Sequence, residues 1–282
     1  MSWHLGMLCA LDFESTGLSV DDDRIVTACV ALVDGSGQHR PDVRTWLINP
    51  GIDIPAGATK IHGITTEHAR EHGQDPGTAI AEIVTDLADA LDAGIPIVGH
   101  NVGGYDLSLL DRETRRHAVA PLTPFPVIDT QVLSKHVDPF RKKVSATQGP
   151  HTLKTCAQVF RAGWDDEQAH GAAYDALASA RVAWRMGVIA NLPKEQRPKL
   201  ASKASRELFD ALAVPLADLH AFQVKAKAAQ DAGFADYLGR QSKAARTVEE
   251  QLALYERSEA VRAEAVVGHW PVVPYQHSEA MA

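Results

Sequence analysis

Two carboxylates, Asp12 and Glu14, stand at the end of an apolar run that begins at Met7. If this run is a buried strand, its side chains alternate between faces, so both acids point the same way. Leu11 and Phe13 would then point into the core. Carboxylates at the edge of an apolar interior are costly unless a cation or a hydrogen-bond network compensates them. The pair therefore indicates either a cation site or two strand-end acids solvated by a loop.

Three further groups with suitable chemistry follow along the chain. Asp106 begins a predicted helix just after Gly99-His100-Asn101, so it lies where the sheet presents its strand ends. Asp175 lies on a long predicted helix, and His170 precedes it by five residues. Five helical steps place two side chains about 140° apart. His170 can therefore face the same site as Asp175 only from a loop before that helix.

Together these groups fit phosphodiester hydrolysis, although each alone has an ordinary explanation as a helix cap or a solvated residue. Ligand sets made only of oxygen select Mg²⁺ or Mn²⁺ over zinc. Two such ions about 3.5–4 Å apart activate an attacking water and stabilise the departing oxygen. Histidine titrates near neutral pH and is suited to accept the proton of that water.

The pattern of predicted elements gives an α/β fold. Three consecutive strands at residues 7–13, 24–33 and 43–48 predict an antiparallel meander. Short, uncharged strands at 95–98 and 125–128 follow helices, which is typical of buried parallel strands reached by crossovers. The predicted helices begin near Thr65, at Thr78, near Tyr105, at Asp129-Thr130, at Thr152 and at Ala172. A mixed five-stranded sheet flanked by helices is the expected architecture.

Composition sets further bounds. The chain has 282 residues, 45% of them hydrophobic, and a formal net charge of −8, which argues against a protein that coats duplexes by neutralising many phosphates. Three widely spaced cysteines give neither a disulfide framework nor a zinc motif. The first strand starts too early to leave room for a signal peptide, and no apolar run approaches the roughly 20 residues of a membrane helix. We expect a soluble, cytoplasmic protein.

The chain divides near Pro193. Residues 1–192 form the predicted catalytic domain, and residues 193–282 form an Ala-, Lys-, Glu- and Gln-rich helical extension. Its predicted helices span about 200–212, 216–238 and 247–266. The extension contains 12 Lys and Arg and 12 Asp and Glu, so the whole formal charge of −8 falls on residues 1–192. Docking to a polymerase, self-association and a substrate-covering cap stay open as roles for the extension, and Trp270 is a candidate anchor of its end.

Three motifs resemble those of the DEDDh-type 3′-5′ exonucleases of the ribonuclease-H-like superfamily, a group that includes the proofreading subunit of bacterial replicative DNA polymerase. They are Asp12-Phe13-Glu14-Ser15-Thr16-Gly17-Leu18, then Gly99-His100-Asn101 with Tyr105-Asp106-Leu107, then His170 with Asp175-Ala176. The resemblance covers about residues 7–190 and implies a ribonuclease-H-like mixed sheet, three strands antiparallel and two parallel. It also implies removal of nucleoside monophosphates from single-stranded 3′ ends.

The resemblance implies a role for each motif residue. Asp12, Glu14, Asp106 and Asp175 would bind the two ions, with Asp12 shared and Glu14 on the ion nearer His170, the general base. Thr16 and the turn after Glu14 would hold the 3′-terminal nucleotide. Leu18 and Ile64 would pack against terminal bases, although Ile64 is equally well explained as core. The full set expected at the substrate is Phe13, Ser15, Thr16, Gly17, Leu18, Ile64, His100, Asn101 and Tyr105.

One spacing departs from the family. The family places its second-motif aspartate five residues after the histidine, whereas Asp106 lies six residues after His100. A turn at Gly103-Gly104 would absorb the additional residue; without such a turn the Asp106 side chain would point in another direction. Elsewhere, Arg141-Lys142-Lys143 is the best local basic patch, and we interpret it as a contact for the nucleic-acid backbone in an otherwise acidic domain.

The motifs leave the substrate open. We expect a DNA exonuclease, and a ribonuclease or oligoribonuclease that trims RNA 3′ ends fits the same residues. A non-catalytic nucleic-acid or polymerase adaptor is the alternative from another class. The complete set of acids argues against it, because those acids repel phosphate unless a metal is bound.

Overall fold

The apolar run that starts at Met7 forms β1 (Met7–Ser15), the central strand of a five-stranded sheet in the computed structural model of the chain. The structure describes residues 2–201, 205–266 and 268–275. The strand order is β3-β2-β1-β4-β5, with β2 at Ile25–Asp34, β3 at Asp42–Leu47, β4 at Ile97–Gly99 and β5 at Val127–Asp129. The first three strands are antiparallel, and β4 and β5 run parallel to β1. The predicted mixed sheet is therefore confirmed.

Alternation along β1 separates two hydrophobic layers. Leu8 and Ala10 pack into one buried cluster, and Leu11 and Phe13 pack into the other. Asp12 and Glu14 continue the row of Leu8 and Ala10, because side chains two residues apart share a face. Both acids therefore lie on the sheet face that carries the first cluster, at the carboxyl end of the strand.

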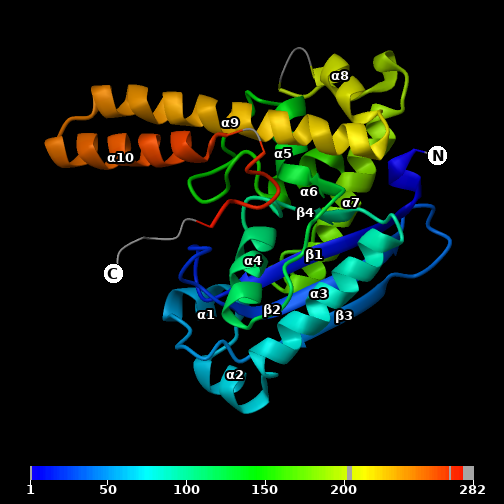
Figure 1. Cartoon of the computed structure of the whole chain (residues 1–282). Helices are drawn as coiled ribbons and strands as arrows, with labels where there is room; N and C mark the ends of the chain where they lie inside the picture. The colour runs from blue at the N-terminus through cyan, green and yellow to red at the C-terminus, as the bar shows by residue number, and fades with distance from the viewer. Residues whose placement is uncertain (1, 202–204, 267, 276–282) are drawn as a thin grey trace.

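Helices cover both faces of the sheet (Figure 1). The helices α3 (Pro76–Asp92) and α4 (Asp106–Arg116) pack on one face, and α5 (Thr130–Val137), α6 (Leu153–Phe160) and α7 (Ala172–Ala190) pack on the other. Two short helices, α1 (Ala56–His62) and α2 (Thr66–His72), follow β3. The predicted caps are confirmed: the side chains of Thr65, Asp129 and Thr152 accept hydrogen bonds from the first turns of α2, α5 and α6.

The C-terminal residues form α8 (Ser205–Leu208), α9 (Leu216–Ala244) and α10 (Val248–Glu264). Short 3₁₀ turns lie at Trp3–Leu5, Lys194–Gln196 and Phe209–Leu212. The helix predicted near residues 200–212 is shorter than expected, and its part at 202–204 lies outside the described residues. Phe209, Leu212 and Leu219 are fully buried in the same cluster as α7. The extension therefore contributes to the core of the sheet domain.

The first half of α9 covers the open edge of the sheet at β5. The side chain of Gln223 accepts a hydrogen bond from Asp129 N at 2.7 Å and donates one to Val127 O at 2.9 Å. His220 Nδ1 accepts a hydrogen bond from Val127 N at 3.1 Å. These side chains satisfy backbone groups that an edge strand would otherwise leave unpaired. Beyond this contact α9 and α10 form a helical hairpin that extends away from the sheet (Figure 1).

Within the described part of the chain, none of the helices combines the length and the apolar character that a membrane span requires. The division of the chain at residue 192 stays a prediction.

Candidate active site

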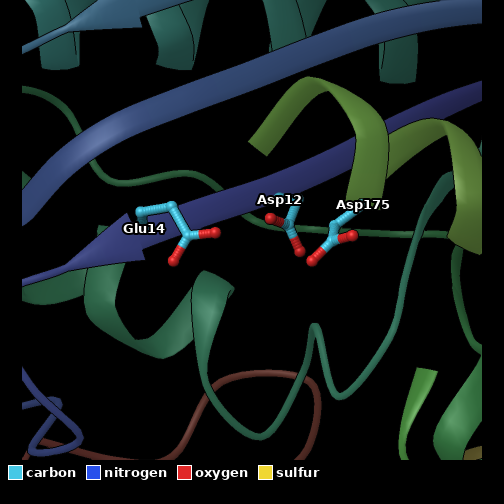
Figure 2. Close-up of side chains that lie close together, drawn as sticks. All are labelled: Asp12, Glu14 and Asp175. Atoms are coloured by element: carbon cyan, nitrogen blue, oxygen red, sulfur yellow. The ribbon is translucent and has the colours of Figure 1, made fainter. Parts of the chain in front are cut away.

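Three carboxylates converge at the carboxyl end of β1. Asp12 and Glu14 come from the strand, and Asp175 comes from the first turn of α7, which crosses above it (Figure 2). Each contributes an oxygen, and these oxygens lie within 4.8 Å of one another. The structure therefore brings Asp12 and Glu14 together with Asp175, and the roles of these three acids stay a prediction.

The fourth predicted acid, Asp106, begins α4 and is buried, with 6% of its surface exposed. Its Oδ1 accepts a hydrogen bond from Phe13 N, the residue between the two strand acids, at 3.0 Å. Gly104 N and Tyr105 N both donate to Asn101 O, so residues 101–105 form a tight turn. This turn accommodates the additional residue after His100 and directs Asp106 to β1, although Asp106 lies outside the 4.8 Å group.

The electrostatics of the acids favour a cation. Burial, and after it the charge of Asp175, raises the pKa of Glu14 to about 8. Burial, together with the charges of the other three acids, holds the pKa of Asp12 well above its usual range. The pKa of Asp106 is likewise raised well above its usual range, first by burial, and that of Asp175 is raised by burial. Such groups repel one another when ionised, and a bound cation removes that repulsion.

The donor set fits a hard divalent ion. It consists of carboxylate oxygens alone, the kind of ligand that Mg²⁺ and Mn²⁺ prefer. Asp175 Oδ1 is buried and has no hydrogen-bond partner, which is costly for a carboxylate unless a cation satisfies it. Asp12, Glu14 and Asp175 therefore form a candidate metal centre with Asp106 beside it.

His170 lies outside α7, as the helical geometry required, and its side chain is exposed. Its backbone has a positive φ of 66° and precedes the N-cap Gly171. His170 lies close to Asp175. Its charge and its backbone N–H both act to lower the pKa of the Asp175 carboxyl, against the larger effect of burial. The loop thus holds His170 beside Asp175, at the groove that Glu14 also lines.

A groove of about 770 Å³ leads to these residues. Glu14, Ile64 and His170 line it, and Tyr174 and Arg181 of α7 lie further along its wall. Ile64 is half-buried here, so it serves both as a groove wall and as a partner of the small cluster around Val26. Of the clustered acids, Glu14 lines this groove directly.

The turn after Glu14 is fixed from within. Ser15 Oγ lies 2.7 Å from Gly17 O and 2.6 Å from the Tyr105 hydroxyl, which is itself within hydrogen-bond distance of Gly17 O, so the two hydroxyls distribute their two protons among these contacts. Thr16 Oγ1 donates to Asp23 at 2.7 Å, so the hydroxyl expected at the nucleotide is already engaged. Leu18 projects from this turn with 92% of its surface exposed. Phe13 is buried and faces the core.

His100 and Asn101 are internal supports of the site in this structure. His100 Nε2 donates to His151 O at 2.8 Å, and Nδ1 lies 2.9 Å from Thr130 Oγ1. Burial lowers the pKa of His100 and favours the neutral ring. Asn101 N donates to Asp129 Oδ1 at 3.0 Å. Neither ring nitrogen of His100 is directed at the three acids.

Asp129 is an additional acid, which the sequence predicts to cap the next helix close to the site. Its fully buried carboxylate accepts hydrogen bonds from the backbone N–H groups of Asn101, Gly103, Gln131 and Val132. It therefore joins the turn before Asp106 to the start of α5. The signal available in the sequence was the position of Asp129 at a strand end next to the motif strand β4.

Comparison with known proteins agrees with this geometry. Residues 9–183 match the family model RNase_T, described as Exonuclease. The match covers more than half of the chain, which therefore belongs to this exonuclease family. The predicted resemblance to DEDD-type 3′-5′ exonucleases of the ribonuclease-H-like fold is confirmed.

Curated relatives include the PolC-type DNA polymerase III of several bacteria. The Ureaplasma parvum protein is 26% identical over 171 residues, which is 61% of this chain and 11% of that protein. The Lacticaseibacillus paracasei protein is 30% identical over 176 residues, which is 62% of this chain and 11% of that protein. The chain thus spans about a tenth of the length of these relatives.

Solved structures of exonuclease I share the fold. E. coli exonuclease I in complex with a dA16 oligonucleotide has a TM-score of 0.54 at 17% identity and covers 80% of this chain and 44% of its own. A moderately thermophilic exonuclease I from Methylocaldum szegediense has a TM-score of 0.52 at 19% identity and covers 73% and 42%.

Proposed function

We propose that the chain is a metal-dependent 3′-5′ exonuclease that removes nucleoside 5′-monophosphates from single-stranded ends, with DNA as its main substrate. The observation that carries this proposal is the convergence of Asp12, Glu14 and Asp175 within 4.8 Å in a chain of the exonuclease family. Exonuclease I, which shares the fold, has been crystallised with single-strand oligonucleotides, and the PolC relatives connect the domain to DNA synthesis.

The four acids hold Mg²⁺ or Mn²⁺ in this proposal, most simply two ions. When bound, these ions offset the charge of the scissile phosphate and of the leaving oxygen. Asp12 and Asp175 approach from a strand and a helix, so both elements must be in place for the centre to form. Asp106 is held at its hydrogen bond to Phe13 and lies beside the other acids.

His170 acts as general base. An imidazole nitrogen accepts a proton from the attacking water while the water oxygen bonds to phosphorus and the P–O3′ bond breaks. The terminal nucleotide leaves with a 5′-phosphate, and the departing O3′ takes a proton from solvent, so the shortened strand ends in a 3′-hydroxyl. The exposed position of His170 at the groove suits this role, because the proton can pass on to solvent.

The substrate strand would contact apolar and basic side chains around the site. Leu18 and Ile64 offer apolar surface for the terminal bases. Such contacts tolerate any base, because every base has an apolar face. In the predicted basic patch, Arg141 points inward and pairs with Asp138 at 2.8 Å, with 7% of its side chain exposed. Lys142 and Lys143 stay exposed, next to Phe140 with 77% of its surface exposed. These three side chains offer a stacking surface and two charges for the strand upstream.

The assay is digestion of oligonucleotides labelled at either end. The wild-type chain should shorten a 5′-labelled strand stepwise and release the labelled nucleotide at once from a 3′-labelled strand, only with Mg²⁺ or Mn²⁺ present. Asp12→Asn and Asp175→Asn should abolish both products, whereas the exposed Asp92→Asn control should not. Full activity in either site variant would overturn the proposal.

Matched DNA and RNA strands in the same assay decide between substrates. Faster digestion of RNA would favour the ribonuclease alternative. Oligonucleotide binding with no product at any metal concentration would favour a non-catalytic adaptor.

A further inference from the structure

Trp270, from the C-terminal end of the described chain, lies against the turn that leads into α4. Its side chain is 5% exposed, and its ring lies 5.2 Å from that of His220. A Cβ placed on Gly103 would meet three atoms of Trp270 first, two of them at 2.7 Å. Gly103 does not have a positive φ, so the indole is what excludes a side chain at this position.

Hydrogen bonds attach the rest of the same segment to α4. Val273 N donates to Ser108 Oγ at 3.0 Å, and Ser108 Oγ donates to Gly103 O at 3.2 Å. The buried guanidinium of Arg112 donates to Val273 O at 2.7 Å and to Pro274 O at 3.3 Å. The segment 270–275 therefore forms a strap across the helix that begins with Asp106.

The opposite side of the turn is held by the site itself. Gly103 N donates to Asp129 Oδ2 at 3.3 Å, and Asp106 Oδ1 accepts from Phe13 N at 3.0 Å. The turn from Gly103 to Asp106 runs between these two hydrogen bonds. Its glycines, Gly103 and Gly104, restrict its backbone little. The indole of Trp270 occupies the space in which this turn would otherwise relax.

We propose that Trp270 is a positioning residue for Asp106, and that the end of the extension thereby completes the active site. The inference rests on the proposed function of Asp106 as a metal ligand. Residues that orient ligands in this way typically change metal affinity or activity by about 10–100-fold when they are lost.

The test compares two buried tryptophans in the whole 282-residue chain. Trp3 is 7% exposed and donates to Leu212 O, and it precedes β1, at the opposite end of the strand from Asp12. Trp270→Ala should weaken calorimetric Mn²⁺ binding and raise the Mn²⁺ concentration for half-maximal activity by about tenfold or more. Trp3→Ala should leave both values unchanged, and Trp270→Phe should restore most of the affinity.

A second pair of variants tests the contact itself. Gly103→Ala should weaken Mn²⁺ binding in the wild-type background, because the new methyl group displaces the indole or the turn. In the Trp270→Ala background the same change should have little further effect, since the space is open. This cycle also covers the case in which one substitution alone lowers the yield of folded protein.

Wild-type Mn²⁺ affinity in Trp270→Ala, or equal losses in Trp3→Ala, would overturn the inference. So would additive effects of Gly103→Ala and Trp270→Ala. Any of these three results would leave the proposed function intact if Asp12→Asn and Asp175→Asn are still inactive. Activity in those two variants would instead remove the proposed function, whatever the result at Trp270.

Discussion

Asp106 Oδ1 accepts a hydrogen bond from the backbone N–H of Phe13 at 3.0 Å, and Phe13 lies between Asp12 and Glu14 on β1. The bond joins the first residue of α4 to the strand that carries two of the clustered acids. Asp106 therefore has two separable properties, an acceptor that supports the fold and a negative charge that the proposed metal centre needs.

Substitution of Asp106 should separate these properties. Asp106→Asn keeps an acceptor oxygen for Phe13 N and should fold with wild-type stability or better without metal, because it removes one repelling charge, yet lose Mn²⁺-dependent cleavage. Asp106→Ala leaves a buried N–H unsatisfied and should lower the free energy of unfolding by about 1–3 kcal/mol. Urea denaturation and the digestion assay measure both. Wild-type activity in Asp106→Asn would contradict the proposed role of the charge.

The raised pKa values of the acids predict how stability depends on pH. Glu14 has a pKa of about 8 in the folded chain against an ordinary value of 4.5. Between these values the folded state binds more protons than the unfolded state. The free energy of unfolding of the metal-free protein should therefore fall as pH rises from about 4.5 to about 8, by up to about 1.4 kcal/mol per pH unit for one carboxyl.

Thermal denaturation between pH 4.5 and pH 9 tests this dependence. Glu14→Gln should flatten it, because the amide cannot ionise. Mn²⁺ should stabilise the wild-type protein more at pH 8 than at pH 6, since protons compete with the ion for the carboxylates. An unchanged pH dependence in Glu14→Gln would show that Glu14 is not the titrating group.

Loss of the proposed base should slow chemistry without weakening the metal centre. His170→Ala should reduce kcat by about 10²–10⁴-fold. Calorimetric Mn²⁺ affinity should stay at the wild-type value, because the imidazole is not among the clustered ligands. His68→Ala, on the exposed surface of α2, is a matched control. A loss of Mn²⁺ affinity equal to that of Asp12→Asn would rule out the general-base role.

Local sequence patterns predicted the strands of the sheet and the direction of the strand acids, because both depend on residues close together in the chain. Alternation along β1 fixed the facing of Asp12 and Glu14, and helical geometry placed His170 outside α7. Side-chain caps at Thr65 and Thr152 follow from the preference of a threonine oxygen for free backbone N–H groups at helix starts.

Contacts between distant residues could not be predicted in the same way. Gln223 pairs with Val127, 96 residues away, and Trp270 excludes a side chain at Gly103. Periodicity along the chain does not reveal such pairs. The composition of residues 193–282 predicts helices without net charge, but not what those helices contact. The sequence likewise assigns Arg141 to a basic patch for the nucleic-acid backbone, whereas its guanidinium is paired with Asp138 and donates to Ser134 Oγ at 3.0 Å.

The exposed part of that loop should affect binding of long strands only. Phe140→Ala and the double variant Lys142→Ala/Lys143→Ala should raise KM for a 20-nucleotide strand and leave a dinucleotide unaffected, because a dinucleotide does not reach the loop. Each lost phosphate contact should reduce the slope of log KM against log salt by about 0.7. Tyr255→Ala, on α10, is an exposed aromatic control. Equal changes for both substrates would contradict contact upstream of the scissile bond.

Loss of the Gln223 side chain should lower the free energy of unfolding more than loss of an exposed glutamine on the same pair of helices. Gln223→Ala removes the acceptor of Asp129 N and the donor to Val127 O at the buried edge of β5. We expect a loss of about 1–3 kcal/mol in the free energy of unfolding from the unsatisfied N–H alone. The exposed Gln251→Ala should change stability by less than about 0.5 kcal/mol. Equal denaturation midpoints for the two variants would mean that α9 covers β5 without stabilising it through these bonds.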